Sequence, residues 1–263
     1  MPMADAPADL AGMSLLDPHV QDDPFAMYEA MQDASGIYRM PETGFFVVSR
    51  YADLRAVLTD PLTLSNEVDR AALQGAELAQ GHQHYLAEHG WPHINTLQRT
   101  DAPVHSRYRK LVDRVFTVGR VRDMTPHIDA VAEQLIDRFA DQGTCDYVRD
   151  FAMLLPGTIL AEEMGLDADD VATFKRWADA MLAPASRQMS AEELRDVADI
   201  ELEAQHHLAR LFEACRTTPR AGIISGLVHA HADGEEPLSM AELQSLMSQL
   251  IGGGFESTMT ALG

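Results

Sequence analysis

The chain has 263 residues, of which 41 are acidic and 20 are basic, so its formal net charge is −21 at pH 7. This charge disfavours nucleic acid and anionic membrane as general partners, because both would repel it. Hydrophobic residues make up 46% of the chain, a share typical of a globular protein with a sizeable core. Cys145 and Cys215 lie far apart and in no CxxC pattern, which predicts a reducing compartment rather than a disulfide framework.

No apolar run reaches the roughly 18 residues that suggest a transmembrane helix. The N-terminal residues also lack the basic region and the long apolar region of a secretory signal. We therefore predict a cytoplasmic protein that binds no membrane. We also expect a monomer, with a disordered lead-in over residues 1–22 and one domain over residues 23–263.

Most of the chain shows the apolar spacing of helices, which predicts a mainly α fold with a small β-sheet. Predicted helices span 23–34, 51–59, 103–116, 120–141, 151–164, 167–182, 190–215, 221–230 and 239–263. Ile37–Met40 and Phe45–Ser49 flank a turn and predict a hairpin, and 145–148 predicts a short strand. Residues 60–100 are weakly patterned, which is typical of a functional loop such as a lid.

The last predicted helix contains an apparent defect. Ser239 and Glu242 form a capping-box start, and an apolar face follows at helical spacing. The three glycines at 252–254 then cost a helix roughly 3 kcal/mol relative to alanine, at about 1 kcal/mol each. Glycine tolerates a broken hydrogen-bond ladder and lets another body approach the backbone. Two interpretations stay open: a bulged helix against a flat ligand, or a helix that ends at Gly252 before a loop.

An acid and two hydroxyls follow these glycines, at Glu256, Ser257 and Thr258. On the first interpretation, the acid and a neighbouring alcohol would serve as a proton relay. A hydrolase that uses Glu256 and Ser257 is a further alternative, although the sequence shows no obvious base histidine for it.

The second notable segment is basic within an acidic chain. Between residues 105 and 122 there are six of the 20 cations and one acid, Asp113. The cations are Arg107, Arg109, Lys110, Arg114, Arg120 and Arg122. His105 and Arg109 are four residues apart, so on a helix they share a face and could jointly hold carboxylates. A solvated basic helix face is the alternative interpretation.

Together, these segments resemble the cytochrome P450 family. The resemblance rests on DAPVHSRYRKLV followed by VFT, on LIGGGFEST, and on the intervening CDYVRDFAMLLPGTILAEEMGLDADDVATFKRW. It covers nearly the whole chain from Asp23, in the family's order, and it implies the P450 fold and a heme-dependent monooxygenase. The expected reaction is hydroxylation of an apolar small organic molecule with O2 and electrons from an acidic ferredoxin-type donor.

The resemblance also implies roles for individual residues. It makes 103–116 helix C, with His105 and Arg109 binding the propionates of heme b, and it makes 239–263 helix I. Gly253 and Gly254 would lie at the groove for dioxygen, and Glu256 and Ser257 would deliver protons. Serine stands here where the family more often has threonine. The resemblance makes 62–100 a pocket-lining loop, and the candidate substrate-binding residues are Ile94, Leu97, Met181 and Leu182.

The family's ExxR helix and its heme-thiolate loop follow helix I and are not in this sequence, and neither cysteine has the glycine-rich setting of that loop. We therefore expect the front portion of a monooxygenase that is inactive alone. A non-catalytic, truncated helical binding or scaffold protein is the alternative.

Histidines offer a third type of site. His82, His84 and His89 could ligate a metal, as could His229 and His231, but no Cys or acid completes a recognised spacing. The sequence therefore predicts no metal-ligating residues.

Overall fold

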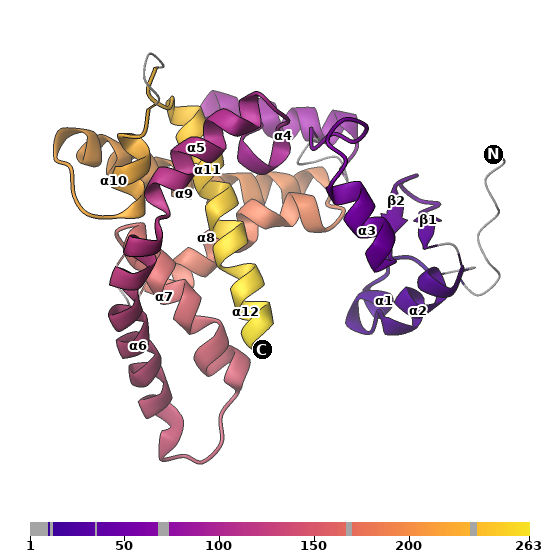
Figure 1. Ribbon diagram of the computed structural model, residues 1–263, viewed down its shortest axis with the longest axis horizontal. Coiled ribbons are helices and arrows are strands. Elements are labelled where there is room, and N and C mark those ends of the chain that lie inside the picture. Colours follow the sequence, from indigo (N-terminus) through magenta and orange to yellow (C-terminus); the bar gives the residue numbers. More distant parts are fainter. Residues whose placement is uncertain (1–9, 11–12, 35, 68–73, 167–169, 232–235) are drawn as a thin grey trace. The chain divides into compact units, whose positions relative to one another are not determined.

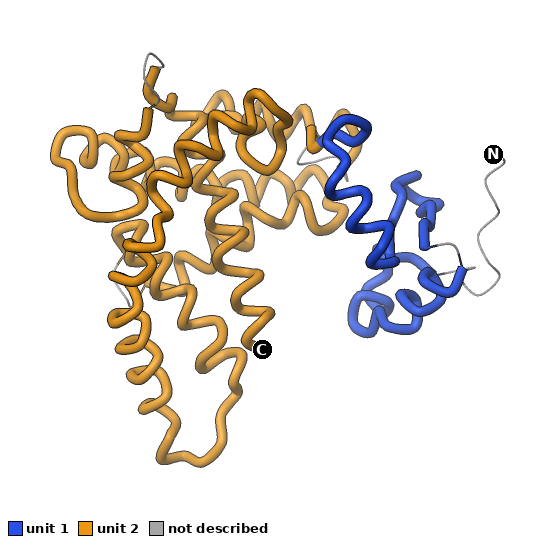
Figure 2. The backbone as a smooth tube through the Cα atoms, viewed as in Figure 1, with its two compact units in different colours: residues 1–65 blue, residues 66–263 orange. Residues whose placement is uncertain are grey.

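The computed structural model describes the chain except for residues 1–9, 11–12, 35, 68–73, 167–169 and 232–235 (Figure 1). Its contacts divide the chain into two compact units, residues 1–65 and 66–263, each described here by itself (Figure 2). The single domain expected over 23–263 remains a prediction.

The first unit contains three helices and a hairpin. Its elements are α1 (Pro18–Asp22), α2 (Phe25–Ala34), β1 (Ile37–Arg39), β2 (Phe46–Val48) and α3 (Tyr51–Leu58). The strands pair antiparallel with Ile37 opposite Val48, which confirms the predicted hairpin.

The expected disordered lead-in over residues 1–22 is wrong where the structure describes it, at residue 10 and residues 13–22. Leu10 is buried in a small core with Met27 and Met31, and Pro18–Asp22 is helical. The N-terminal segment folds because its apolar side chains find partners on α2, and the remainder of the lead-in lies outside the described residues.

All the regular secondary structure that the structure describes in the second unit is helical. Its elements are α4 (Ala76–His89), η3 (Leu97–Arg99), α5 (Val104–Val115), α6 (Val118–Ala140), η4 (Val148–Ala152), α7 (Leu154–Glu163), α8 (Val171–Ser186), α9 (Ala191–Thr217), α10 (Ile223–Val228), α11 (Met240–Gly254) and α12 (Glu256–Leu262). The fold is thus mainly α with one small two-stranded sheet among the described residues, as predicted.

Two predictions for this unit are wrong. Residues 60–100 are not simply a loop, because α4 lies within them; only three of its side chains are buried, so its apolar spacing is weak. The strand expected at 145–148 is also wrong, since Val148 opens the π-helical turn η4. Residues 68–73 and the predicted helix start at Asp167 lie outside the described residues.

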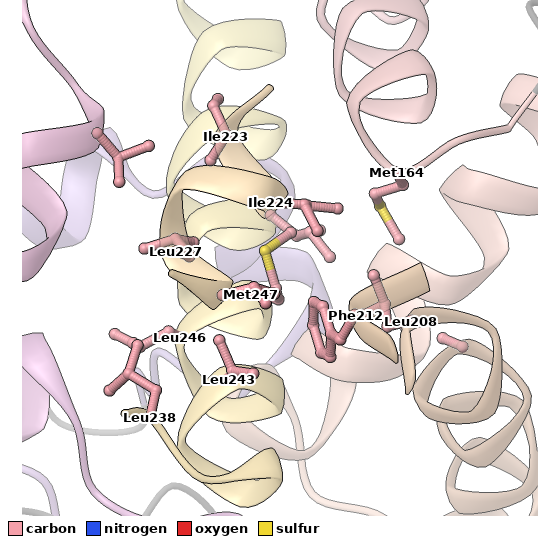
Figure 3. Close-up of a cluster of buried hydrophobic side chains, with 14 of the residues drawn as sticks. Met164, Leu208, Phe212, Ile223, Ile224, Leu227, Leu238, Leu243, Leu246 and Met247 are labelled. Carbon is pink, nitrogen blue, oxygen red and sulfur yellow. The ribbon is translucent and has the colours of Figure 1, made fainter. Parts of the chain in front are cut away.

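The core of this unit is built around α11 (Figure 3). Leu243, Leu246 and Met247 are buried on one face of α11 and meet side chains of α9 and α10. The predicted capping box is confirmed at its start: the Glu242 carboxylate accepts from the Ser239 N–H at 2.7 Å, and the Ser239 hydroxyl accepts from the Glu242 N–H at 3.3 Å. These bonds satisfy two amides that a helix start otherwise leaves unpaired.

The predicted defect is also present, slightly later than expected. The helix continues through all three glycines, breaks at Phe255 and resumes as α12, so the interpretation that ends it at Gly252 is wrong. Phe255 is 1% exposed and packs edge-on against Phe174, with ring centroids 5.1 Å apart. The break is therefore fixed by a core side chain.

Candidate functional site

The helix is interrupted at the junction of α11 and α12. Backbone bonds run from the Phe255 N–H to Ile251 and from the Met259 N–H to Phe255. Phe255 separates the two helices, and the Ser257 hydroxyl donates to the Gly253 carbonyl across it at 2.5 Å. The side chain thus supplies a hydrogen-bond donor to a carbonyl at this break.

The glycines at the break are not equivalent. A Cβ on Gly252 would meet Leu182 at 2.9 Å, and one on Gly254 would meet Leu160 at 3.4 Å. A Cβ on Gly253 would meet nothing described within 4 Å. Gly253 therefore leaves an open notch in the helix surface.

The acid–alcohol pair lies on α12, which has no buried residue. Glu256, Ser257 and Thr258 are all exposed. Phe255 takes the inward position at this turn, and the polar residues after it point outward. An exposed acid and hydroxyl can exchange protons with water.

A small cavity borders the notch. Its volume is about 200 Å³, and Ile94, Leu182, Gly252 and Gly253 contribute to its wall. Its polar lining comes from Asn95, Gln98, Arg99, Ser245, Ser248 and Gln249, with His93 and Ala185 completing the wall. The cavity wall thus combines apolar side chains with amide, hydroxyl and guanidinium groups.

The segment on one side of this cavity is fastened to α11. The Ile94 N–H donates to the Ser245 hydroxyl at 3.0 Å, and the Gln249 amide donates to the Thr96 hydroxyl at 2.5 Å.

The four residues predicted to bind substrate fall into two groups. Ile94 and Leu182 line the cavity, whereas Met181 is buried in the core and Leu97 packs against it.

His105 and Arg109 lie on α5, on one face as predicted. The side chain of His105 is partly buried and makes no hydrogen bond or ion pair with any described residue. Arg109 is 59% exposed and pairs with Asp113 at 2.8 Å. No described contact joins either side chain to the notch.

Helix α5 is nevertheless held to the start of α11. The Arg107 guanidinium donates to the Glu242 carboxylate at 2.6 Å, and the Tyr108 hydroxyl donates to the same oxygen at 2.9 Å. Burial and the Glu242 carboxylate raise the pKa of Tyr108 to about 12. Burial disfavours a charged Glu242, but the Ser239 N–H and Arg107 outweigh it, so the pKa of Glu242 is lowered. Gly253 then lies eleven residues beyond Glu242, roughly 16 Å along an α-helix.

Several cations of the basic segment are used within the fold. Arg107 pairs with Glu242, Arg120 pairs with Glu163, and Arg114 donates to the His231 carbonyl. Lys110 and Arg122 are exposed and have no described partner. The local basic excess therefore reaches the surface at fewer positions than its sequence suggests.

Comparisons of the sequence and the structure with known proteins indicate the family to which the chain belongs. None of the protein-family models compared with the chain matches it. The chain is 27% identical to the polyketide biosynthesis cytochrome P450 PksS of Bacillus subtilis, over 92% of this chain and 58% of that protein. It is 30% identical to the mycinamicin IV hydroxylase/epoxidase of Micromonospora griseorubida, over 89% of this chain and 56% of that protein. The solved structure of cytochrome P450 CREJ with (4-ethylphenyl) dihydrogen phosphate superposes with a TM-score of 0.78 and 26% identity, over 95% of this chain and 61% of that one.

The fold is that of a cytochrome P450. The chain belongs to the cytochrome P450 family. It spans somewhat over half the length of the curated relatives it matches. Among the described residues, none of the helices combines the length and apolar character needed to cross a bilayer.

Membership of this family implies a heme group. Residues on α5 and α11 fit the two carboxylates and the flat macrocycle of that group. An unpartnered imidazole and an exposed guanidinium on one face of α5 are suitable donors for two carboxylates. The open side of Gly253 allows close approach of a flat ligand to α11. Cys215 is 1% exposed within the core, and Cys145 lies exposed between α6 and η4. Neither cysteine is in the setting of a heme thiolate.

The structure also assembles a cluster that the sequence analysis missed. His82, considered there with His84 and His89, instead lies beside His93 and Glu201. The acid is 119 residues away from His82 in sequence, so no local spacing could have indicated it.

Proposed function

We propose that this chain contributes helix C and helix I to a heme-dependent monooxygenase that inserts oxygen into a small organic molecule. The observation that carries the proposal is the interrupted helix at 252–258, where a serine hydroxyl donates to a main-chain carbonyl beside an open glycine and a cavity. Such a break costs helix stability, and it is most readily explained by a ligand that needs the space.

In this proposal, His105 and Arg109 hold the propionates of heme b, and Gly253 and Gly254 face the macrocycle. The bound heme supplies the iron at which dioxygen is activated. The proposed protein is cytoplasmic and monomeric and receives electrons from an acidic ferredoxin-type partner. The iron's cysteine ligand is assigned to neither Cys145 nor Cys215.

Glu256 and Ser257 are proposed to deliver protons to the dioxygen site. Because the Ser257 hydrogen points to the Gly253 carbonyl, the hydroxyl oxygen keeps its lone pairs available as acceptors. That bond fixes the rotamer of a side chain that lacks threonine's methyl group. The exposed Glu256 would take protons from water and pass them toward this position.

For the substrate, we propose an apolar molecule that carries oxygen functions. Ile94 and Leu182 would contact its apolar part, and the amide and hydroxyl groups that line the same cavity would meet its polar groups. One relative is named for polyketide biosynthesis and another as a mycinamicin IV hydroxylase/epoxidase, which supports an organic substrate for this chain.

The acid–alcohol pair provides the test. In protein expressed from the complete reading frame, we expect Glu256→Gln and Ser257→Ala to lower product formation by about 100-fold, the lower range for a lost proton-transfer group. Oxygen consumption should fall by a smaller factor than product formation, so a smaller fraction of the consumed oxygen should appear in product. Ser257→Thr is the matched control and should retain activity. Unchanged coupling in both disabling variants would contradict the assigned roles.

A further inference from the structure

Three segments distant in sequence bring two imidazoles and one carboxylate together. His82 comes from α4, His93 from the segment between α4 and η3, and Glu201 from the middle of α9. The His93 Nε2 lies 2.8 Å from one Glu201 oxygen, and the His82 Nε2 lies 3.9 Å from the other. Potential ligand atoms of all three lie within 4.8 Å of one another.

The cluster is buried in the second unit. The side chains of His82 and Glu201 are each 2% exposed, and that of His93 is 10% exposed. A carboxylate in such a position needs a positive partner, because burying an unpaired charge costs several kcal/mol or more. Either a protonated histidine or a metal ion can supply that charge.

The backbone around the cluster is firmly positioned. The Trp91 N–H donates to the Gln205 amide oxygen at 2.9 Å, and the Gln205 amide donates back to the Trp91 carbonyl at 3.0 Å. The His93 N–H donates to the Gln83 side chain at 3.1 Å. Leu86 of α4 packs on α9 in a small apolar cluster next to the site. The three potential ligands are therefore held on a shared scaffold.

We propose that His82, His93 and Glu201 bind a Zn²⁺ ion. Two neutral imidazoles and one carboxylate are a recurrent zinc donor set that leaves a fourth position open for water. Ligand atoms at about 2.0–2.2 Å from one zinc ion lie roughly 3.3–3.6 Å apart in a tetrahedron. One ligand atom from each of the three residues lies within 4.8 Å of the other two, so side-chain shifts of about 1 Å complete the site. Zinc replaces the proton of the imidazole–carboxylate pair as the source of positive charge.

A cavity borders the site. A cavity of about 320 Å³ between α4 and α9 is lined by His82, Gly81 and Tyr85, among others. His93 also lines the smaller cavity beside Gly253. The ion therefore connects α4 and α9 through a residue that forms part of the candidate substrate wall, and its binding does not depend on the proposed heme chemistry.

The test measures zinc in protein expressed from the complete reading frame. After chelator treatment, the protein is titrated with ZnSO4 by calorimetry, and bound zinc is counted by elemental analysis, which separates zinc from iron. We expect one zinc per chain and no comparable binding of Mg²⁺, which prefers oxygen ligands. His93→Ala and Glu201→Gln should each weaken zinc binding by at least about 100-fold, since changes to mere outer-shell partners already cost 10–100-fold.

His84→Ala is the matched control, because His84 lies on the same helix with its side chain 75% exposed. It should leave zinc binding unchanged, and circular dichroism should show native helicity in every variant used. Zinc stoichiometry below one-tenth in the folded wild-type protein would overturn the proposal and leave a buried ion-pair cluster. Binding that survives Glu201→Gln and His93→Ala would also overturn it.

Discussion

The hydroxyl of Ser257 and the imidazole of His105 are the two side chains on which the proposed site depends most. The shared helix face of His105 and Arg109 could be predicted from sequence, because a spacing of four residues is a local pattern. The bond from Ser257 to Gly253 is equally local, four residues along one helix. The partners of Arg107 could not be predicted, since Glu242 lies 135 residues away.

Replacing His105 or Arg109 with alanine should weaken heme retention. Each change removes one donor to a carboxylate, and a hydrogen bond to a charged group contributes about 1.5–3 kcal/mol, so affinity should fall roughly tenfold or more. The measurement is heme dissociation followed by transfer to an apo-globin acceptor. Lys110→Ala on the same helix is the control, and equal loss from all three variants would reject specific propionate contacts.

Glu242 predicts an acid-dependent contribution to stability. Its pKa is lowered from the ordinary 4.5, so its contribution is present above pH 4.5 and is lost as pH falls through the folded-state pKa. Glu242→Gln should therefore lower the free energy of unfolding at pH 7 by about 1–2 kcal/mol. The difference in this free energy between the variant and the wild-type protein should narrow below pH 4.5.

The measurement is the urea midpoint of each protein at a series of pH values. Glu193→Gln is the control, because Glu193 occupies the same capping-box position on α9 but has a side chain that is 46% exposed, against 15% for Glu242. It should have the smaller effect at pH 7. If the difference in unfolding free energy between Glu242→Gln and the wild-type protein stays constant from pH 7 through the acid range, Glu242 makes no acid-dependent contribution to stability.

At the scale of elements, the helices with strong apolar spacing were predictable within a few residues. Helix α4 was not, because only three of its fourteen residues are buried. The break between α11 and α12 was predictable from its glycines, but its position at Phe255 depends on the distant ring of Phe174. The cluster of His82, His93 and Glu201 also needs the packing of α4 on α9, which no local pattern contains.

The notch at Gly253 gives a prediction that separates stability from ligand binding. Gly253→Ala should stabilise the helix by up to about 1 kcal/mol, since alanine is the better helix former and no described atom opposes its Cβ. Gly253→Leu should leave the fold intact but fill the notch, so heme incorporation should fall at least tenfold. Thermal unfolding of the apoprotein and heme content after reconstitution measure the two effects. Full heme incorporation in Gly253→Leu would show that no ligand uses the notch.

At the scale of the whole molecule, the net charge of −21 opposes approach of an acidic protein, whereas Lys110 and Arg122 favour it locally. If the donor binds near these cations, raising ionic strength from about 0.01 M to about 0.1 M should slow its association, because the Debye length falls from about 30 Å to about 10 Å. Lys110→Glu and Arg122→Glu should slow it further at low salt. Stopped-flow reduction measures the rate, and acceleration by salt would place the donor on an acidic surface instead.

We propose that this P450-family chain holds heme between α5 and the notch of α11. The heme content of protein expressed from the complete reading frame, together with its reduced, CO-bound absorption spectrum, tests this proposal. We expect about one heme per chain with the red-shifted Soret band of a thiolate-ligated iron. A folded, monodisperse protein that takes up no heme would contradict it.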